Sequence, residues 1–249
     1  MQDKIGILKE WIDKCDNIVF FGGAGVSTES GVPDFRSKDG LYNQHDVRFD
    51  RYRPEYLLSH SCLIDEPKVY FEFHRQKMDT REIEPNYAHK YLAGLERQGK
   101  LKAVVTQNID GLHQKAGSRK VYEIHGSALR NYCMKCGKVY PEDYIFNSTE
   151  DVPHCDCGGV IRPDITLYEE CLPDDAVNHA VEAISKAQML IIGGTSLTVY
   201  PAASYINYFR GQYLAVINRD RLDISRFGAQ TLMIEDSIGK VFKSIDGVN

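Results

Sequence analysis

The sequence lacks the features of a membrane-inserted or exported protein. None of its apolar runs approaches the length needed to cross a bilayer. The first sixteen residues, MQDKIGILKEWIDKCD, have no basic stretch followed by an apolar one, as a signal peptide requires, and are too acidic for a transit peptide. We therefore expect a soluble, cytoplasmic protein that has no membrane partner.

The sequence also lacks an excess of positive charge. It has 30 Lys and Arg residues against 35 Asp and Glu residues, which gives a formal net charge of −5. General nucleic-acid binders are normally basic, so a nucleic-acid partner is not expected. With 43% hydrophobic and 26% charged residues over 249 positions, the composition is that of a globular protein long enough to bury a sizeable core.

Cysteine usage argues against a secreted disulfide scaffold, because the seven cysteines are odd in number and widely scattered. Four of them form two close pairs, Cys133-x-x-Cys136 and Cys155-x-Cys157. This pattern is typical of a zinc site, and four thiolates close the tetrahedron of the ion, so the zinc would be structural. The alternative interpretation is four unrelated buried thiols.

Apolar runs bounded by polar residues or glycine alternate with helical patterns along the chain. Buried parallel strands are predicted at residues 17–21, 101–106, 189–192, 213–217 and 231–234. Helical periodicity is found at residues 3–15, 88–95, 177–184 and 238–245. This order predicts an α/β fold with a doubly wound parallel sheet.

Two segments, at about residues 22–100 and 126–186, are much longer than a crossover between parallel strands requires. We expect both to leave the sheet and to form a smaller lobe. The boundaries expected are 1–36, 86–126 and 161–249 for the large domain, and 37–85 and 127–160 for the small one. Clefts between lobes are preferred ligand sites.

Glycine-rich and polar motifs follow the first two predicted strands. Residues 22–28, GGAGVST, match part of the dinucleotide-binding fingerprint and are expected to open a helix, although a tight structural turn fits equally well. The acidic residue that closes the second strand in ordinary dehydrogenases is missing, which disfavours hydride transfer. Residues 106–113, TQNIDGLH, place polar side chains where parallel sheets bind ligands; the alternative is a polar turn that caps the next helix.

Three further motifs stand at predicted strand ends. His125 is a candidate general base near neutral pH, although a lone histidine is more often structural. Residues 193–196, GGTS, and Asn218 are candidates for phosphate or ribose contacts, and both also fit plain turns.

Together these motifs resemble the sirtuin family of NAD-dependent protein deacylases over nearly the whole chain. The resemblance rests on GAGVSTESGVPDFR at 23–36, TQNIDGLH at 106–113, HGS at 125–127, the cysteine pairs and GTSLTVYPAA at 194–203. It implies a Rossmann-like large domain, a small domain made of a zinc module and a helical module, and a cleft between them. It also implies that acylated-lysine proteins or peptides are the substrates and that the acyl group passes to ADP-ribose.

The resemblance further implies roles for individual residues. His125 would be the catalytic base, with Asn108 as a second catalytic residue. Contacts with NAD are implied for Ala24, Gly25, Thr28, Phe35, Arg36, Gln107, Asn108, Ile109, Asp110, Thr195, Ser196, Asn218 and, near the adenine, Ile238. One structural zinc would be held by Cys133, Cys136, Cys155 and Cys157.

One segment departs from the common wording of the family. Residues 162–170, RPDITLYEE, carry Tyr168-Glu169 where many members have Phe-Gly, and the added carboxylate favours substrates with basic flanking residues. Residues 71–75, FEFHR, do not match the tyrosine–arginine pair that binds acidic acyl groups, so deacetylation is expected. The alternatives are another acyl group, protein ADP-ribosylation, or a zinc-containing module that senses NAD without catalysis.

Overall fold

The computed structural model describes residues 2–35, 37–224 and 227–247. Within these ranges, six strands form one parallel sheet in the order β3-β2-β1-β7-β8-β9. The strands are β1 (Ile18–Gly22), β2 (Leu101–Thr106), β3 (Val121–Glu123), β7 (Met189–Gly193), β8 (Tyr213–Asn218) and β9 (Gln230–Glu235). The two central strands, β1 and β7, are buried along their whole length, as apolar strands covered on both faces must be.

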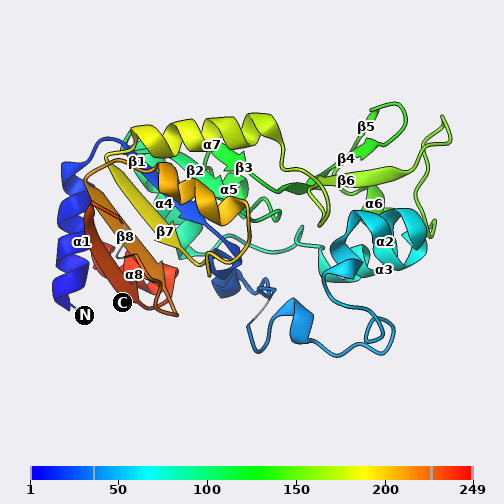
Figure 1. The fold of residues 1–249 in the computed structure, drawn as a ribbon, viewed down its shortest axis with the longest axis horizontal. Coiled ribbons are helices and arrows are strands. Elements are labelled where there is room, and N and C mark those ends of the chain that lie inside the picture. Colours follow the sequence, from blue (N-terminus) through cyan, green and yellow to red (C-terminus); the bar gives the residue numbers. More distant parts are fainter. Residues whose placement is uncertain (1, 36, 225–226, 248–249) are drawn as a thin grey trace.

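Helices cover both faces of this sheet (Figure 1). One face packs against α1 (Gln2–Lys14), α4 (Tyr87–Arg97) and α8 (Ile238–Asp246), which bury Leu8, Leu92 and Phe242 in one hydrophobic cluster. The opposite face packs against α7 (Asp174–Lys186) and the 3₁₀ helix η5 (Ala202–Tyr208). The predicted doubly wound α/β fold is therefore confirmed. No helix in the described ranges is long and apolar enough to span a membrane.

The two long segments do leave the parallel sheet, and they meet beside it (Figure 1). The second segment supplies β4 (Gly126–Cys133), β5 (Val139–Tyr140) and β6 (Ile161–Ile165), which form an antiparallel sheet in the order β5-β4-β6. Helices α2 (His60–Asp65), α3 (Pro67–Lys77) and α6 (Tyr144–Asn147) share a hydrophobic cluster with this sheet. We refer to these elements together as the small lobe.

One local prediction is wrong. Residues 24–30 form the 3₁₀ turns η1 (Ala24–Val26) and η2 (Thr28–Ser30) and do not open an α-helix, because Gly25 is tied by its backbone to the neighbouring strand end and Gly31 turns left-handed at φ +92°. β6 begins at the domain boundary expected at residue 161 and pairs with β4; the domain boundaries stay a prediction. The chain returns to the parallel sheet only with α7.

Candidate active site

The turns that follow β1 and β7 pack directly on each other at the carboxyl edge of the sheet. The Gly25 N–H donates a hydrogen bond of 2.8 Å to the carbonyl oxygen of Gly194. A Cβ atom on Gly25 would lie 2.8 Å from Gly194 Cα, and one on Gly194, whose φ is +58°, would lie 2.4 Å from Val26 N. Glycine is thus required at both positions. Bare backbone at this edge lets a phosphate group approach closely.

A buried polar network joins the first turn to the segment after β2. The Ser27 hydroxyl donates to Asp110 Oδ2 at 2.6 Å and accepts from Asn108 Nδ2 at 3.0 Å. His89 of α4 completes the network: its Nδ1 accepts from the Asn86 N–H, so its Nε2 carries the proton and faces Ser27 Oγ at 3.5 Å. All four side chains of this network are nine-tenths or more buried. Such polar groups are fixed in place by their partners.

The carboxyl group of Asp110 is buried and accepts hydrogen bonds from two partners. Burial raises its pKa above the ordinary value, and the bonds from Ser27 and from the Leu112 N–H, at 2.9 Å, partly offset that effect. The bond to Leu112 shows that the segment also acts as the polar turn before α5 (Leu112–Lys115). The helix-capping interpretation and the binding interpretation of this motif are therefore compatible.

His125 follows β3 and lies beside the same segment. Its Nδ1 is 2.9 Å from the carbonyl oxygen of Gln107, which can only accept, so Nδ1 carries the proton and Nε2 is left as the basic nitrogen. Burial lowers the pKa of His125 below its ordinary value, and the bond to Gln107 opposes this shift. The imidazole is therefore neutral at pH 7 and can accept a proton at Nε2.

Hydrogen bonds hold several of the residues implied for NAD binding at the strand ends, and one of them joins the segments after β2 and β7, which flank β1. Gln107 Nε2 donates to Thr195 Oγ1 at 3.1 Å, and Thr28 Oγ1 donates to the Gly25 carbonyl at 3.1 Å. Asn218, at the end of β8, donates to the Asp220 carbonyl at 2.9 Å. These residues lie at the carboxyl ends of adjacent parallel strands, where open α/β sheets bind ligands.

Other implied NAD contacts lie at the margin of this edge or outside it. Ser196 is exposed and shares a hydrogen bond with Thr198. Ile238 is 2% exposed and packs in the core, so its side chain is not accessible to a ligand. Arg36 lies outside the described residues.

Three apolar or small positions complete the set. Phe35 packs against Tyr42 with tilted rings whose centroids are 5.5 Å apart, and it lies on the cluster around Phe49 and Phe73. Ile109 contacts this cluster and the small-lobe core. Ala24 begins the turn η1 beside Gly25.

The four paired cysteines converge at the end of the small sheet. Their sulfur atoms all lie within 4.8 Å of one another, with Cys133 and Cys157 at 3.5 Å and Cys136 and Cys155 at 3.7 Å. A tetrahedral zinc ion with Zn–S bonds of about 2.3 Å requires sulfur separations of about 3.8 Å. The donor set and its spacing therefore fit one structural zinc ion.

Glycines shape both cysteine turns. Gly137 and Gly158 have φ values of +71° and +78°, and their N–H groups donate to the carbonyls of Cys133 and Cys155. A Cβ on Gly159 would lie 2.7 Å from the Cys133 sulfur. The shorter Cys155-x-Cys157 pair thus closes a turn of the same kind. None of the seven cysteines, all of which are described, forms a disulfide.

Comparison with known proteins identifies the family. The model of the Sir2 family matches residues 23–201, which is more than half of the chain. The chain belongs to the Sir2 family. Curated relatives named NAD-dependent protein deacetylase include one from Clostridium perfringens, 54% identical over 98% of this chain and 99% of the relative, and one from Clostridium acetobutylicum, 52% identical over 98% of each.

Solved structures of Sir2 proteins match this Sir2 chain over almost its full length. A complex described as Sir2 with a p53 peptide and NAD⁺ is 34% identical, with a TM-score of 0.83 over 98% of this chain and 97% of that one. A Sir2 variant with a deacetylated p53 peptide and 3′-O-acetyl ADP ribose is 31% identical, with a TM-score of 0.85 over 98% and 99%. The Rossmann-like fold with a separate zinc lobe is therefore shown for this Sir2 protein.

The sequence did not point to two residues of the Sir2 site. Ser27 lies inside the glycine motif, but nothing in the motif indicates that its hydroxyl joins Asn108 and Asp110. His89 lies on α4, far from the motifs along the chain, and reads as an ordinary helix residue. Its Asn86-x-x-His89 spacing, which forms a capping box, was the only available signal.

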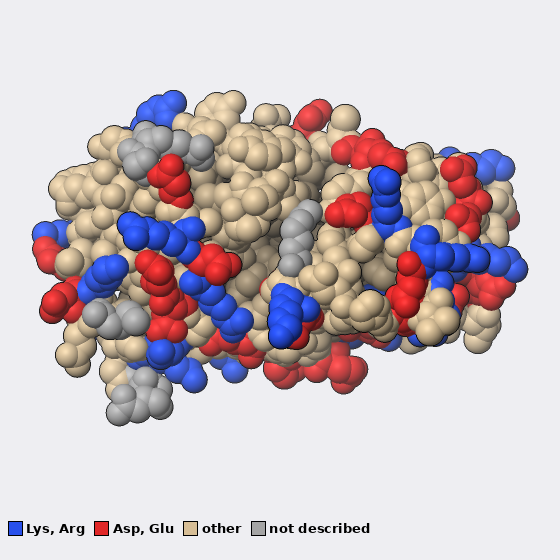
Figure 2. Space-filling model, turned by 60° about the horizontal axis from the view of Figure 1, so that its bottom comes forward, with Lys and Arg blue, Asp and Glu red and all other residues tan. Residues whose placement is uncertain are grey.

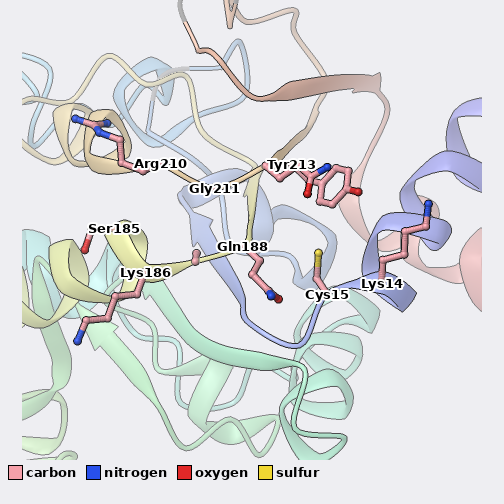
Figure 3. A pocket seen from close by; sticks show the side chains of 10 residues that line it. Lys14, Cys15, Ser185, Lys186, Gln188, Arg210, Gly211 and Tyr213 are labelled. Atoms are coloured by element: carbon pink, nitrogen blue, oxygen red, sulfur yellow. The ribbon is translucent and has the colours of Figure 1, made fainter.

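A separate cavity lies at the opposite edge of this Sir2 sheet. It has a volume of about 370 Å³ and is lined by segments that precede β1, β7 and β8, with Cys15, Gln188 and Tyr213 among its residues (Figure 3). Parallel sheets bind ligands at their carboxyl edge, so this cavity is not part of the candidate active site.

Proposed function

We propose that this Sir2 protein is an NAD-dependent protein lysine deacetylase that transfers the acetyl group to ADP-ribose and releases nicotinamide. The observation that carries the proposal is the neutral His125, whose Nδ1 is held by the carbonyl of Gln107, the residue directly before Asn108 of the buried network with Ser27 and Asp110. The names of the curated relatives support the activity.

Each part of the carboxyl edge takes one task. The glycine turns at Gly25 and Gly194, with Thr28, bind the phosphates, and Thr195, Ser196 and Asn218 bind the adenosine half. Phe35, Ile109 and the amide-bearing Gln107 and Asn108 enclose the nicotinamide end, where Asp110 accepts from the amide. When bound, NAD supplies a cationic leaving group and the ribose that accepts the acetyl group.

His125 accepts a proton at Nε2 from a ribose hydroxyl, which makes the ribose oxygen a better nucleophile toward the acetyl carbon. Its Nδ1 stays bonded to the Gln107 carbonyl, which holds the ring in orientation and stabilises the imidazolium that forms. The Asn108 side-chain amide donates to the Ser27 hydroxyl and the Asn108 backbone N–H donates to the Thr106 hydroxyl, so this residue is positioned before substrate binds.

Acetyl-lysine is the substrate we favour over lysines with acidic acyl groups. Arg75, the cation of the segment that such groups would require, is directed to the carbonyls of Ile145, Glu150 and Asp151 in the small lobe. His74 beside it is fully buried, and burial lowers its pKa to about 3, so it is uncharged. Neither residue offers a positive charge to an acyl chain.

The test is a product analysis with NAD and matched acetyl-, succinyl- and long-chain-acyl-lysine peptides. We expect nicotinamide and deacetylated peptide to form in a one-to-one ratio, and only when NAD and the acetyl peptide are both present. Deacetylation without NAD would contradict the mechanism. ADP-ribosylated protein without deacetylation would replace it by the transferase alternative.

The remaining expectations belong to the same proposal. We propose 1–36, 86–126 and 161–249 as the large NAD-binding domain, and 37–85 and 127–160 as the small domain. Acidic and basic side chains intermingle on the face shown in Figure 2 without a single extended basic area, which supports a protein partner over nucleic acid. We also propose a cytoplasmic location without a membrane partner, which the ordinary globular composition supports.

A further inference from the structure

Glu169 occupies an unusual backbone position. Its φ is +75°, in the left-handed region that favours glycine and is strained for other residues. Its carboxylate is engaged at the same time: Oε2 accepts from the Ser61 N–H at 2.9 Å and from the Ser61 hydroxyl at 2.6 Å. A strained residue persists where its surroundings fix it, so this position merits a functional explanation.

The residues on either side of Glu169 bind the same stretch of chain. Tyr168 exchanges backbone hydrogen bonds of 3.0 Å with residues 58 and 60, and its hydroxyl lies 2.9 Å from that of Tyr42. Glu170 lies 2.9 Å from His60 Nδ1 and pairs with the buried Arg162. Three consecutive residues are thus fastened to the start of α2, and Glu169 supplies the side-chain contact in the middle.

The other end of this segment is tied to the candidate catalytic residue. The Thr166 N–H donates to the carbonyl of His125 at 2.9 Å, directly after Ile165 pairs with Gly126. β6 is an edge strand of the small sheet. An edge strand of this kind can accept an extended peptide as an added strand.

We propose that Glu169 is a positioning residue that holds residues 166–170 against Ser61 and so fixes the edge that receives the acyl-lysine peptide. The inference rests on the proposed function for the identity of the peptide. Glycine at this position would allow the same backbone turn without holding it. We call the Glu169–Ser61 contact the clasp. Its two hydrogen bonds restrict the backbone at residue 169 and link the helical part of the small lobe to the segment beside His125.

The experiment compares Glu169→Gly, Glu169→Gln and Ser61→Ala with the unaltered protein. The primary measurement is the Kd of a fluorescently labelled acetyl-lysine peptide, followed by kcat and the KM values for peptide and NAD. We expect Glu169→Gly to weaken peptide binding roughly fivefold, the scale of one or two lost hydrogen bonds. The value of kcat at saturating peptide and the KM for NAD should change less than twofold.

The conservative variants separate positioning from folding. Glu169→Gln keeps an oxygen that accepts from Ser61, so it should restore peptide binding to within twofold. Ser61→Ala should weaken binding, and combining it with Glu169→Gly should add little further loss, because both remove the same clasp. Glu182→Gln, an exposed change on α7 with a local lysine partner, is the matched control and should have no effect.

Amide hydrogen exchange supplies a readout that does not depend on activity. Exchange at residues 60–61 and 168–169 should be faster in Glu169→Gly. Unchanged peptide Kd in Glu169→Gly, or equal losses in peptide and NAD binding, would overturn the proposal. If the unaltered protein binds the peptide but never releases nicotinamide, the proposed function fails while the binding and exchange measurements still decide the clasp.

Discussion

At the scale of single residues, hydrogen bonds decide which atom of each side chain is available for chemistry. The Gln107 carbonyl occupies Nδ1 of His125, and the Asn86 N–H occupies Nδ1 of His89. The two neutral histidines therefore carry their proton on different nitrogens. His125 keeps a basic Nε2 at the edge of the sheet, while the protonated Nε2 of His89 faces the buried Ser27.

The first prediction concerns His125. Replacing it by alanine removes the proton acceptor, and we expect kcat to fall at least roughly a hundredfold, the usual scale for loss of a general base. The Kd for NAD should change little, because the glycine turns and Thr195 lie on other strand ends. Nicotinamide release and isothermal titration with NAD measure the two effects. Near-normal turnover would return His125 to a structural role.

The pH dependence of kcat/KM follows from the same residue. The base works when it is neutral, and burial places its pKa below the ordinary value of 6.5. The acid limb of the profile should therefore lie below pH 6.5, and kcat/KM should stay constant between pH 6.5 and pH 7. An acid limb centred above pH 7 would contradict this assignment.

The sequence predicted the site's motifs better than their connections. Strand-end positions identified Thr106–Gln107, His125 and Thr195, because a parallel sheet brings carboxyl ends together whatever the intervening chain does. It could not identify the contact of His89 with Ser27, because that contact depends on how α4 packs against the turn. Nor could it show that Glu169 turns left-handed, because the intrinsic preference of glutamate opposes that conformation.

At the scale of elements, apolar content and periodicity predicted the main strands and helices of the parallel-sheet domain to within a few residues. β2 was predicted with its observed limits, and α8 within one residue at its carboxyl end. Burial of strands on both faces leaves so strong an apolar signal that little else competes with it. The turns after β1 were predicted poorly, because a glycine-rich segment has little intrinsic preference and its form is fixed by the contact with Gly194.

The second prediction concerns the pairing of Arg162 with Glu170, which anchors β6 to the segment after it. Arg162 Nη2 donates to Glu170 Oε2 at 3.0 Å and to the Ile165 carbonyl at 2.7 Å, and its side chain is 4% exposed. Removing one partner leaves a buried charge, so Glu170→Gln should lower the free energy of unfolding at pH 7 by about 3 kcal/mol. Urea denaturation measures this difference.

Acid should erase the same contribution. Burial alone would raise the pKa of Glu170, but the bonds from Arg162, His60 and the Leu167 N–H outweigh it and lower the pKa from 4.5 to about 2. A carboxyl group with a depressed pKa stabilises the fold fully above about pH 4.5 and loses that effect as the pH falls toward 2. The difference in the free energy of unfolding between the unaltered protein and Glu170→Gln should therefore become smaller as the pH falls through this range. A difference in the free energy of unfolding that does not change with pH would show that the Arg162–Glu170 pair does not cause it.

At the scale of the whole molecule, the small lobe is assembled from two distant parts of the chain. α2 and α3 come from the first long segment, and the small sheet with its cysteines comes from the second, yet they share one hydrophobic cluster. Cys133 and Cys155 belong to that cluster themselves, at 1% and 6% exposure. The metal site and the core of the lobe are therefore one structural unit. Loss of the metal should destabilise both segments.

The last prediction follows from this arrangement. We expect one zinc ion per chain on Cys133, Cys136, Cys155 and Cys157. His154 lies near Glu150 and outside the cluster of four sulfur atoms. The exposed Cys171 also lies outside this cluster. Because a four-thiolate site is closed, the ion supports the fold and takes no part in the reaction. Cys157→Ser should release zinc and lower the Tm, with activity lost through unfolding of the lobe.

Cys171→Ser is the matched control for that variant. It removes a thiol of the same chain without touching the cluster, so zinc content should stay at one per chain and the Tm should hold. Metal analysis by mass spectrometry and thermal denaturation with and without a chelator measure both variants. Full zinc content in Cys157→Ser, or loss of zinc from Cys171→Ser, would move the site away from the four cysteines, because a tetrahedral ion cannot keep its affinity after losing one of four thiolates.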